Sequence, residues 1–116
     1  MMNRENDING NKFIICKLFH GDLVLDYKSR RVTLAEEELK LTDTEFRLLF
    51  ELVSNAGKVM GYDELLGKVW SKEYLDEKGY LYTYIRRLRK QIETDPHHPV
   101  HIISISRVGY RFDCIQ

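Results

Sequence analysis

The segment between positions 78 and 92 holds the side chains best suited to binding chemistry. It contains five bases and no acid, although the chain of 116 residues balances 18 Lys and Arg against 18 Asp and Glu. At helical spacing its apolar residues share one face and three of its bases occupy the opposite face, flanked by tyrosines. The apolar positions are Leu81, Ile85, Leu88 and Ile92, and the bases opposite them are Arg86, Arg87 and Lys90. Guanidinium groups on such a face suit guanine edges in a DNA major groove, so nucleic-acid binding is one hypothesis beside an ordinary solvated surface.

Three helical segments are expected to position this face. Thr42 and Glu45 form a capping box at the start of the first, and the stop signal follows near Gly57. The second helix covers YDELLGKVW, and the third runs from about 79 to 93 and ends before an Asp-Pro pair. The apolar stripe of the first helix is Phe46, Leu49, Phe50 and Val53, and that of the second is Leu65, Leu66 and Val69.

Strand signals lie on both sides of the helices. From Phe13 to Leu41, short apolar clusters alternate with turn residues and predict a meander of about four antiparallel strands. After the third helix, HIISIS and YRFDCI flank a turn with Arg107 and Gly109, which predicts a hairpin. Arg107 at such a turn could reach a minor groove beside the helix, which strengthens the nucleic-acid hypothesis. The class is α+β, with a single domain over 13–116 and a polar tail over 1–12 that is expected to be disordered.

Composition excludes several other classes of protein. The longest apolar run is far too short to span a bilayer, and no secretory signal opens the chain. Cys16 and Cys114 are too far apart in sequence for a dense disulfide framework, so free thiols in a reducing cytoplasm are expected. No nucleophile-plus-base pattern, phosphate loop or dinucleotide motif is present, which predicts neither an enzyme nor a cofactor. The spacing of HHPVH (97–101) fits no established closed zinc site, so no metal site is predicted.

Four motifs, taken in order, identify a family. They are LTDTEFRLLFELVSNAGKVM, DELLGKVW, YIRRLRKQIETDP and ISRVGYRF, and the match to the family covers residues 21–112. In this order they resemble the winged-helix effector domain of OmpR/PhoB-type transcriptional response regulators. The resemblance implies a winged helix-turn-helix with an N-terminal four-stranded antiparallel sheet, three helices and a C-terminal β-hairpin wing. It also implies sequence-specific binding of double-stranded DNA in transcription regulation, within a two-component phosphorelay.

The resemblance also assigns roles to individual residues, position by position. The positions expected to read bases are Arg87, Thr83, Tyr80 and Tyr82. The positions expected to hold phosphates are Trp70, Tyr84, Arg86, Arg89, Ser104 and Tyr110. Arg107 is expected to reach the minor groove from the wing. Gly79 and Ser106 depart from the family pattern, which commonly has arginine at both places, so the DNA sequence read is expected to differ from that of the best-known members.

Partners follow from the same resemblance. Direct-repeat promoter sites bound by a head-to-tail dimer are expected, and the loop Ser71 to Glu77 could touch RNA polymerase. Family members also carry a receiver domain with a phosphorylatable aspartate, so this chain is expected to be either a part of a longer regulator or a free-standing effector. The alternative function is a winged-helix protein-interaction module that does not bind DNA, which the zero net charge and the two departures motivate.

Overall fold

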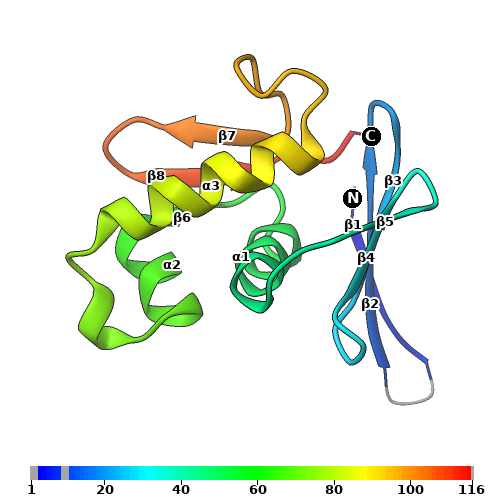
Figure 1. The fold of residues 1–116 in the computed structure, drawn as a ribbon, viewed down its shortest axis with the longest axis horizontal. Coiled ribbons are helices and arrows are strands. Elements are labelled where there is room, and N and C mark those ends of the chain that lie inside the picture. The colour runs from blue at the N-terminus through cyan, green and yellow to red at the C-terminus, as the bar shows by residue number, and fades with distance from the viewer. Residues whose placement is uncertain (1–2, 9–10, 116) are drawn as a thin grey trace.

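Two antiparallel sheets lie on either side of a group of helices (Figure 1). The computed structural model describes residues 3–8 and 11–115, with side chains from Phe13 to Ile115. The first sheet has the order β1-β2-β3-β4-β5 and the second the order β6-β8-β7. The elements are β1 (Asn3–Ile8), β2 (Asn11–Leu18), β3 (Gly21–Asp26), β4 (Arg31–Leu34), β5 (Glu37–Leu39), α1 (Asp43–Ser54), β6 (Val59–Gly61), α2 (Tyr62–Val69), the 3₁₀ turn η1 (Lys72–Tyr74), α3 (Lys78–Ile92), β7 (Ile102–Ile105) and β8 (Gly109–Phe112).

Strands β2 to β5 are the predicted meander. Their register places Ile14 opposite Leu25 and Leu25 opposite Val32, so that residues at a period of two share one face. The residues on this face are buried, namely Ile14, Cys16, Leu18, Leu23, Leu25, Val32 and Leu34. The prediction of four strands with one buried face is confirmed.

Strand β1 differs from the prediction of a disordered tail. Asn3–Ile8 pairs antiparallel with β2, from Asn3 opposite Cys16 to Ile8 opposite Asn11. The polar composition of this segment suggested disorder because it offers no apolar face. Pairing at a sheet edge needs only the backbone N–H and C=O groups that β2 exposes there, and polar residues carry these groups too. Residues 1–2 and 9–10 of the expected tail lie outside the described residues.

Helix α1 begins and ends as its sequence predicts. The Thr42 N–H donates to Glu45 Oε1 at 2.9 Å and the Glu45 N–H donates to Thr42 Oγ1 at 3.2 Å, which is the predicted capping box. Gly57 has φ +88°, the conformation expected of a helix stop signal. The four predicted core residues are buried, and so are Leu48 and Leu52. The helix is buried on more than one side because it lies between the first sheet and the other helices (Figure 1).

Helices α2 and α3 are confirmed within one or two residues of their predicted bounds. The apolar stripe of α3 is buried as predicted, and its bases lie outside the core. Gly61 precedes α2, and its N–H donates to Glu64 Oε1 at 3.4 Å, so this helix has only the carboxylate half of a capping box.

The predicted C-terminal hairpin is formed by β7 and β8, and β6 adds a third strand to it. Gly109 is the first residue of β8 and follows the turn of the hairpin, and a Cβ at this position would collide with the carbonyl oxygen of Met60. Only glycine allows β8 to approach β6 this closely.

The cysteine prediction is wrong, because Cys16 and Cys114 form a disulfide. Their Cα atoms are 5.6 Å apart although 98 positions separate them in sequence, and both residues are buried. Next to them, the Ile115 N–H donates to the Lys17 carbonyl at 2.9 Å. The chain after β8 returns to β2, so distance in sequence did not measure distance in space. Within the described residues, no helix is long and apolar enough to cross a membrane.

Candidate nucleic-acid interface

The outward face of α3 is an exposed surface with basic character. Arg86, Arg87 and Lys90 are exposed, and none of the ion pairs found within residues 13–115 uses them. Tyr80 and Tyr82 are 45% and 50% exposed, which is high for aromatic side chains. Thr83, which follows Tyr82 in the chain, is half-buried. On this face, three of the four predicted base readers are therefore exposed, together with one predicted phosphate contact, Arg86, and with Lys90.

On the side of α3 facing α2, aromatic rings form a continuous cluster. Trp70 packs on Tyr84 with ring centroids 5.3 Å apart, and on Tyr80 at 6.3 Å. Tyr74 from η1 closes the cluster at 5.4 Å from Tyr80. The Arg87 guanidinium lies 4.8 Å from the centroid of the Tyr84 ring, and this cation–π contact favours one direction of the Arg87 side chain.

On the wing side of α3, a second aromatic cluster joins the helix to β8. Tyr62, the first residue of α2, contacts Tyr82 and Tyr110 edge-on, with centroids 6.2 and 6.0 Å apart. The Lys78 ammonium lies 5.3 Å from the Tyr62 ring. Sequence reasoning missed Tyr62, and its place beside Asp63 and Glu64 at the helix start gave no signal of this role.

Arg89 and Ser104 are brought together by the fold. The Arg89 guanidinium donates to the Ile102 carbonyl through Nε at 3.2 Å and Nη2 at 2.8 Å, and Nη2 also donates to Ser104 Oγ at 2.9 Å. These bonds tie α3 to β7. Arg89 and Ser104, both predicted phosphate contacts, are therefore hydrogen-bonded to each other. The Nη1 group of Arg89 takes part in none of these three hydrogen bonds.

Tyr110 is the most buried of the predicted contact residues on the wing. Its side chain lies between Tyr62 and Arg89, whose guanidinium is 5.8 Å from the ring centroid. Burial raises the pKa of Tyr110 to about 12, and the positive charge of Arg89 opposes this shift. The phenol is therefore neutral at physiological pH and can donate a hydrogen bond.

Arg107 lies at the tip of the wing and is exposed. It has φ +66° in the turn closed by the Val108 N–H donating to the Ile105 carbonyl at 3.0 Å. The Tyr62 N–H in turn donates to the Val108 carbonyl at 3.0 Å, which anchors the tip to the start of α2. The structure thus presents Arg107 on a fixed turn rather than on a free loop.

Glu93 is a second residue that sequence reasoning missed. It is 6% exposed, and its carboxylate accepts the backbone N–H groups of Val100, His101 and Ile102. The shortest of these bonds, to Ile102, is 2.6 Å. One carboxylate thus fixes the loop between α3 and β7. The only signal in the sequence was an acid at the end of a basic helix.

The loop Ser71 to Glu77 is anchored at its apolar residues. Leu75 packs against the core and Tyr74 against Tyr80, while Lys72 and Asp76 are exposed. The Ser71 hydroxyl donates to Glu73 Oε1 at 2.8 Å, which lowers the pKa of Glu73. The segment therefore presents a charged surface on a fixed backbone.

The three histidines of HHPVH have separate environments. His101 is buried, with Nδ1 2.7 Å from the Asp113 carbonyl oxygen and Nε2 accepting the Phe19 N–H at 3.4 Å. His98 Nδ1 lies 2.9 Å from Asp95 Oδ2, and His97 lies beside α3. Among residues 13–115 no group of three His, Cys, Asp or Glu side chains is arranged to hold a metal ion.

The exposed helix, the wing beside it and the N-terminal sheet together define the winged-helix class. Residues 36–112 match the family described as "Transcriptional regulatory protein, C terminal", and the chain belongs to this family. The resemblance found in the motifs is thereby confirmed.

Named relatives agree with this family. The KDP operon transcriptional regulatory protein KdpE of Escherichia coli is 42% identical over 92 residues, which cover 79% of this chain and 41% of that protein. The chain thus spans about two fifths of the length of this curated relative. The DNA-binding domain of RstA from Klebsiella pneumoniae, solved in complex with the RstA box, is similar with a TM-score of 0.73 and 30% identity, covering 83% of this chain and 95% of that one. The response regulator DrrB of Thermotoga maritima, described as an OmpR/PhoB homologue, has a TM-score of 0.66 and 37% identity, over 83% of this chain and 43% of that one.

Proposed function

We propose that this chain binds double-stranded DNA in a sequence-specific manner and regulates transcription as the effector part of a two-component response regulator. The observation that carries the proposal is the exposed, acid-free basic face of α3 with a wing fixed beside it. An exposed helix with basic side chains fits a DNA major groove, and the related RstA domain was solved in complex with its DNA box. The DNA-binding domain is proposed to cover 13–116, with β1 extending its sheet.

The roles proposed for individual residues follow from the resemblance to the family. Arg87, Thr83, Tyr80 and Tyr82 are proposed to read base edges, because they lie on or beside the outward face of α3. Trp70, Tyr84, Arg86, Arg89, Ser104 and Tyr110 are proposed to hold phosphates around this face, and Arg107 is proposed to enter the minor groove. Arg87 is the principal base reader in this scheme, because its guanidinium is both exposed and oriented by Tyr84.

Further properties are proposed by analogy with the family. Two copies are proposed to bind direct repeats head to tail, and the charged surface of Ser71 to Glu77 is proposed to meet RNA polymerase. No catalytic activity and no cofactor are proposed. The chain is proposed to act in the cytoplasm, where promoter DNA is found. This location no longer draws support from free thiols, because Cys16 and Cys114 form a disulfide.

A protein-interaction module without DNA binding is the less favoured reading. The observations in its favour were the zero net charge and the departures from the family pattern at Gly79 and Ser106. The neutral total does not describe α3, whose bases lie together on the surface, and Arg107 is still presented at the wing tip. Neither observation therefore argues against a basic DNA-binding surface.

A binding assay with promoter fragments at several salt concentrations tests the proposal. We expect the logarithm of the association constant to fall linearly with the logarithm of salt concentration, by roughly 0.9 per phosphate neutralised. Arg87→Ala should weaken binding to the preferred site by roughly 1–3 kcal/mol and relax one base preference. Arg31→Ala, which removes an exposed arginine from β4, is the matched control and should leave binding unchanged. Absence of measurable binding by the unmodified protein at low salt would contradict the proposal.

A further inference from the structure

The disulfide joins the two sheets of the domain by one covalent bond. Cys16 lies in β2 of the first sheet, and Cys114 follows β8 of the second sheet. The chain after β8 leaves the hairpin and runs to the first sheet (Figure 1). Because 98 positions separate the two cysteines, the bond closes a loop over almost the whole chain and lowers the entropy of the unfolded state.

The fold does not need this bond to compensate for a thin core. Buried apolar side chains come from both sheets and from α1, α2 and α3. Domains that depend on disulfides are small, secreted and dense in cysteine, whereas this chain has two cysteines. In the cytoplasm, where the chain is proposed to act, thiols keep most cysteines reduced, and the disulfides that form there are commonly catalytic or redox-sensing. Because no catalytic activity is proposed, the redox-sensing role is favoured.

The Cys114 end of the disulfide lies in a segment with few hydrogen bonds. Asp113 is fixed, because its N–H donates to the His101 carbonyl at 2.8 Å and its own carbonyl oxygen lies 2.7 Å from His101 Nδ1. After Asp113, the part of the chain that the structure describes has one hydrogen bond, from the Ile115 N–H to the Lys17 carbonyl at 2.9 Å. Release of the segment beyond Asp113 therefore breaks one hydrogen bond and leaves the pairing of β8 intact.

Reduction begins at Cys114 in this arrangement. Cys114 is 8% exposed and Cys16 is fully buried, so a thiolate reaches the Cys114 sulfur first once the segment opens. One thiolate of a dithiol reductant attacks Cys114 Sγ and forms a mixed disulfide, while the bond to Cys16 breaks and its electron pair leaves with Cys16 Sγ. Cys16 takes up a proton, because a charged thiolate is unfavourable among buried apolar side chains. The second thiol of the reductant then attacks the mixed disulfide, which releases Cys114 as a thiol and the reductant as a cyclic disulfide.

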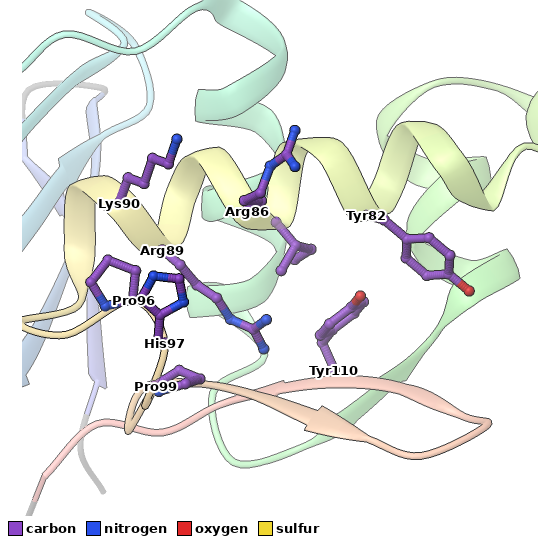
Figure 2. Close-up of a pocket in the computed structure, with 9 residues that line it drawn as sticks. Tyr82, Arg86, Arg89, Lys90, Pro96, His97, Pro99 and Tyr110 are labelled. Carbon is purple, nitrogen blue, oxygen red and sulfur yellow. The ribbon is translucent and has the colours of Figure 1, made fainter.

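The cross-link acts on the proposed DNA-binding surface through folding rather than through contact. None of the residues proposed to bind DNA lies in β2 or after β8. Arg89 of α3 and Tyr110 of β8 line the space between the helix and the hairpin, which neither cysteine lines (Figure 2). These side chains meet only in the folded domain. Because loss of the cross-link lowers the melting temperature by roughly 20 °C, it removes the binding surface over that range of temperatures.

We infer that the disulfide between Cys16 and Cys114 is a reversible redox switch. A dithiol reductant opens it at Cys114 after local release of the segment beyond Asp113, and the reduced domain folds and binds DNA only at lower temperatures. The inference rests on the proposed function for its effect on DNA binding, whereas opening of the disulfide is measured without DNA. It names a signal, the thiol redox state of the surrounding solution, to which the domain itself responds.

The first test measures how the disulfide opens. The oxidised protein is treated with dithiothreitol at urea concentrations below the unfolding transition, and alkylation followed by mass spectrometry gives the reduction rate. Local release exposes little surface, so this rate should hardly change with urea. Ile115→Pro, which removes the N–H bonded to Lys17, should be reduced roughly two- to tenfold faster, whereas Ile115→Ala keeps this N–H and should match the unmodified protein. A rate that rises with urea as steeply as global unfolding, or equal rates in the two variants, would overturn the local opening.

The second test measures DNA binding by the oxidised and reduced forms at two temperatures. At about 10 °C, close to the temperature of maximum stability, the two affinities for the preferred site should agree within about twofold. At about 10 °C below the melting temperature of the oxidised form, the reduced form is mostly unfolded, so its apparent affinity should be roughly 50-fold lower. Oxidised glutathione should restore binding by the reduced form. Cys114→Ala is the matched control, since it lacks the disulfide and should bind in the same way with and without reductant.

The outcomes of the second test separate the switch from the proposed function. If the oxidised and reduced forms lose binding at the same temperature, the disulfide is not a switch although the proposed function stands. If the oxidised protein binds no DNA even at low temperature and low salt, the proposed function fails, and this inference with it.

Discussion

The disulfide between Cys16 and Cys114 should contribute a large part of the stability of the domain. It links β2 to the segment after β8 and so closes a loop over almost the whole chain. Cross-linking a loop of about 100 residues lowers the entropy of the unfolded chain, which stabilises the folded state by about 4.7 kcal/mol. A domain of this size has a total free energy of unfolding of about 5–15 kcal/mol. Reduction should therefore leave the protein folded at room temperature but only marginally stable.

The same figure can be expressed as a melting temperature. Globular proteins unfold with an entropy of about 2.1 cal/mol/K per residue, so a loss of about 4.7 kcal/mol from a chain of this length corresponds to roughly 20 °C. The slope of unfolding free energy against urea should also increase on reduction, because the unfolded chain exposes more surface once the cross-link is absent.

Urea unfolding followed by the fluorescence of Trp70, the single tryptophan, measures these quantities. The oxidised and reduced forms are compared, and mass spectrometry confirms the gain of two hydrogens. Cys114→Ala is the matched control, since it cannot form the cross-link and should not respond to the reductant. A difference below about 1 kcal/mol between the oxidised and reduced protein would refute the loop-entropy reasoning.

Three further predictions concern the elements that position the interface. Gly109→Ala should destabilise the domain by about 3 kcal/mol or more, because the new Cβ would collide with the Met60 carbonyl. The control Gly79→Ala, whose Cβ would have nothing within 4 Å, should be neutral or stabilising. Urea unfolding of both variants measures the difference. Glu93→Gln should cost about 1–3 kcal/mol in the same assay, since the amide offers one acceptor oxygen to three backbone donors, while the exposed Glu77→Gln should cost little. The raised pKa of Tyr110 means that the unfolded state ionises first, so the free energy of unfolding should fall as pH rises from about 10 to about 12. That part of the fall should be absent in Tyr110→Phe, and its persistence there would show that another group is responsible.

The helices could be predicted because their signals are local. The capping box at Thr42 and Glu45 and the stripe that includes Leu81 and Ile85 depend on residues within a few turns of each other. These features appear in the structure at the predicted positions. The strand meander was predictable for the same reason, since its turns join neighbours in sequence.

The features that sequence reasoning missed depend on residues far apart in the chain. The disulfide joins β2 in the first sheet to the segment after β8 in the second sheet, and 98 positions separate the two cysteines in sequence. Strand β1 pairs through backbone groups, which no side-chain pattern reveals. Tyr62 packs against Tyr110, which follows it by 48 residues, and Glu93 accepts hydrogen bonds from the loop that leads to β7. The residue type alone does not reveal such a distant partner.

Arg89 shows why a role transferred by position needs the structure beside it. By resemblance it is a phosphate contact, yet in the folded domain its guanidinium bridges α3 to the Ile102 carbonyl and Ser104. Replacing it with alanine removes a donor for DNA and also leaves a carbonyl of β7 without these bonds, so lower affinity alone would not establish a phosphate contact. Arg86 lacks those bonds to β7 and is exposed on the same helix. Affinity lost in Arg86→Ala therefore reports on the phosphate, and any additional loss of stability in Arg89→Ala reports on the bridge that holds the wing to the recognition helix.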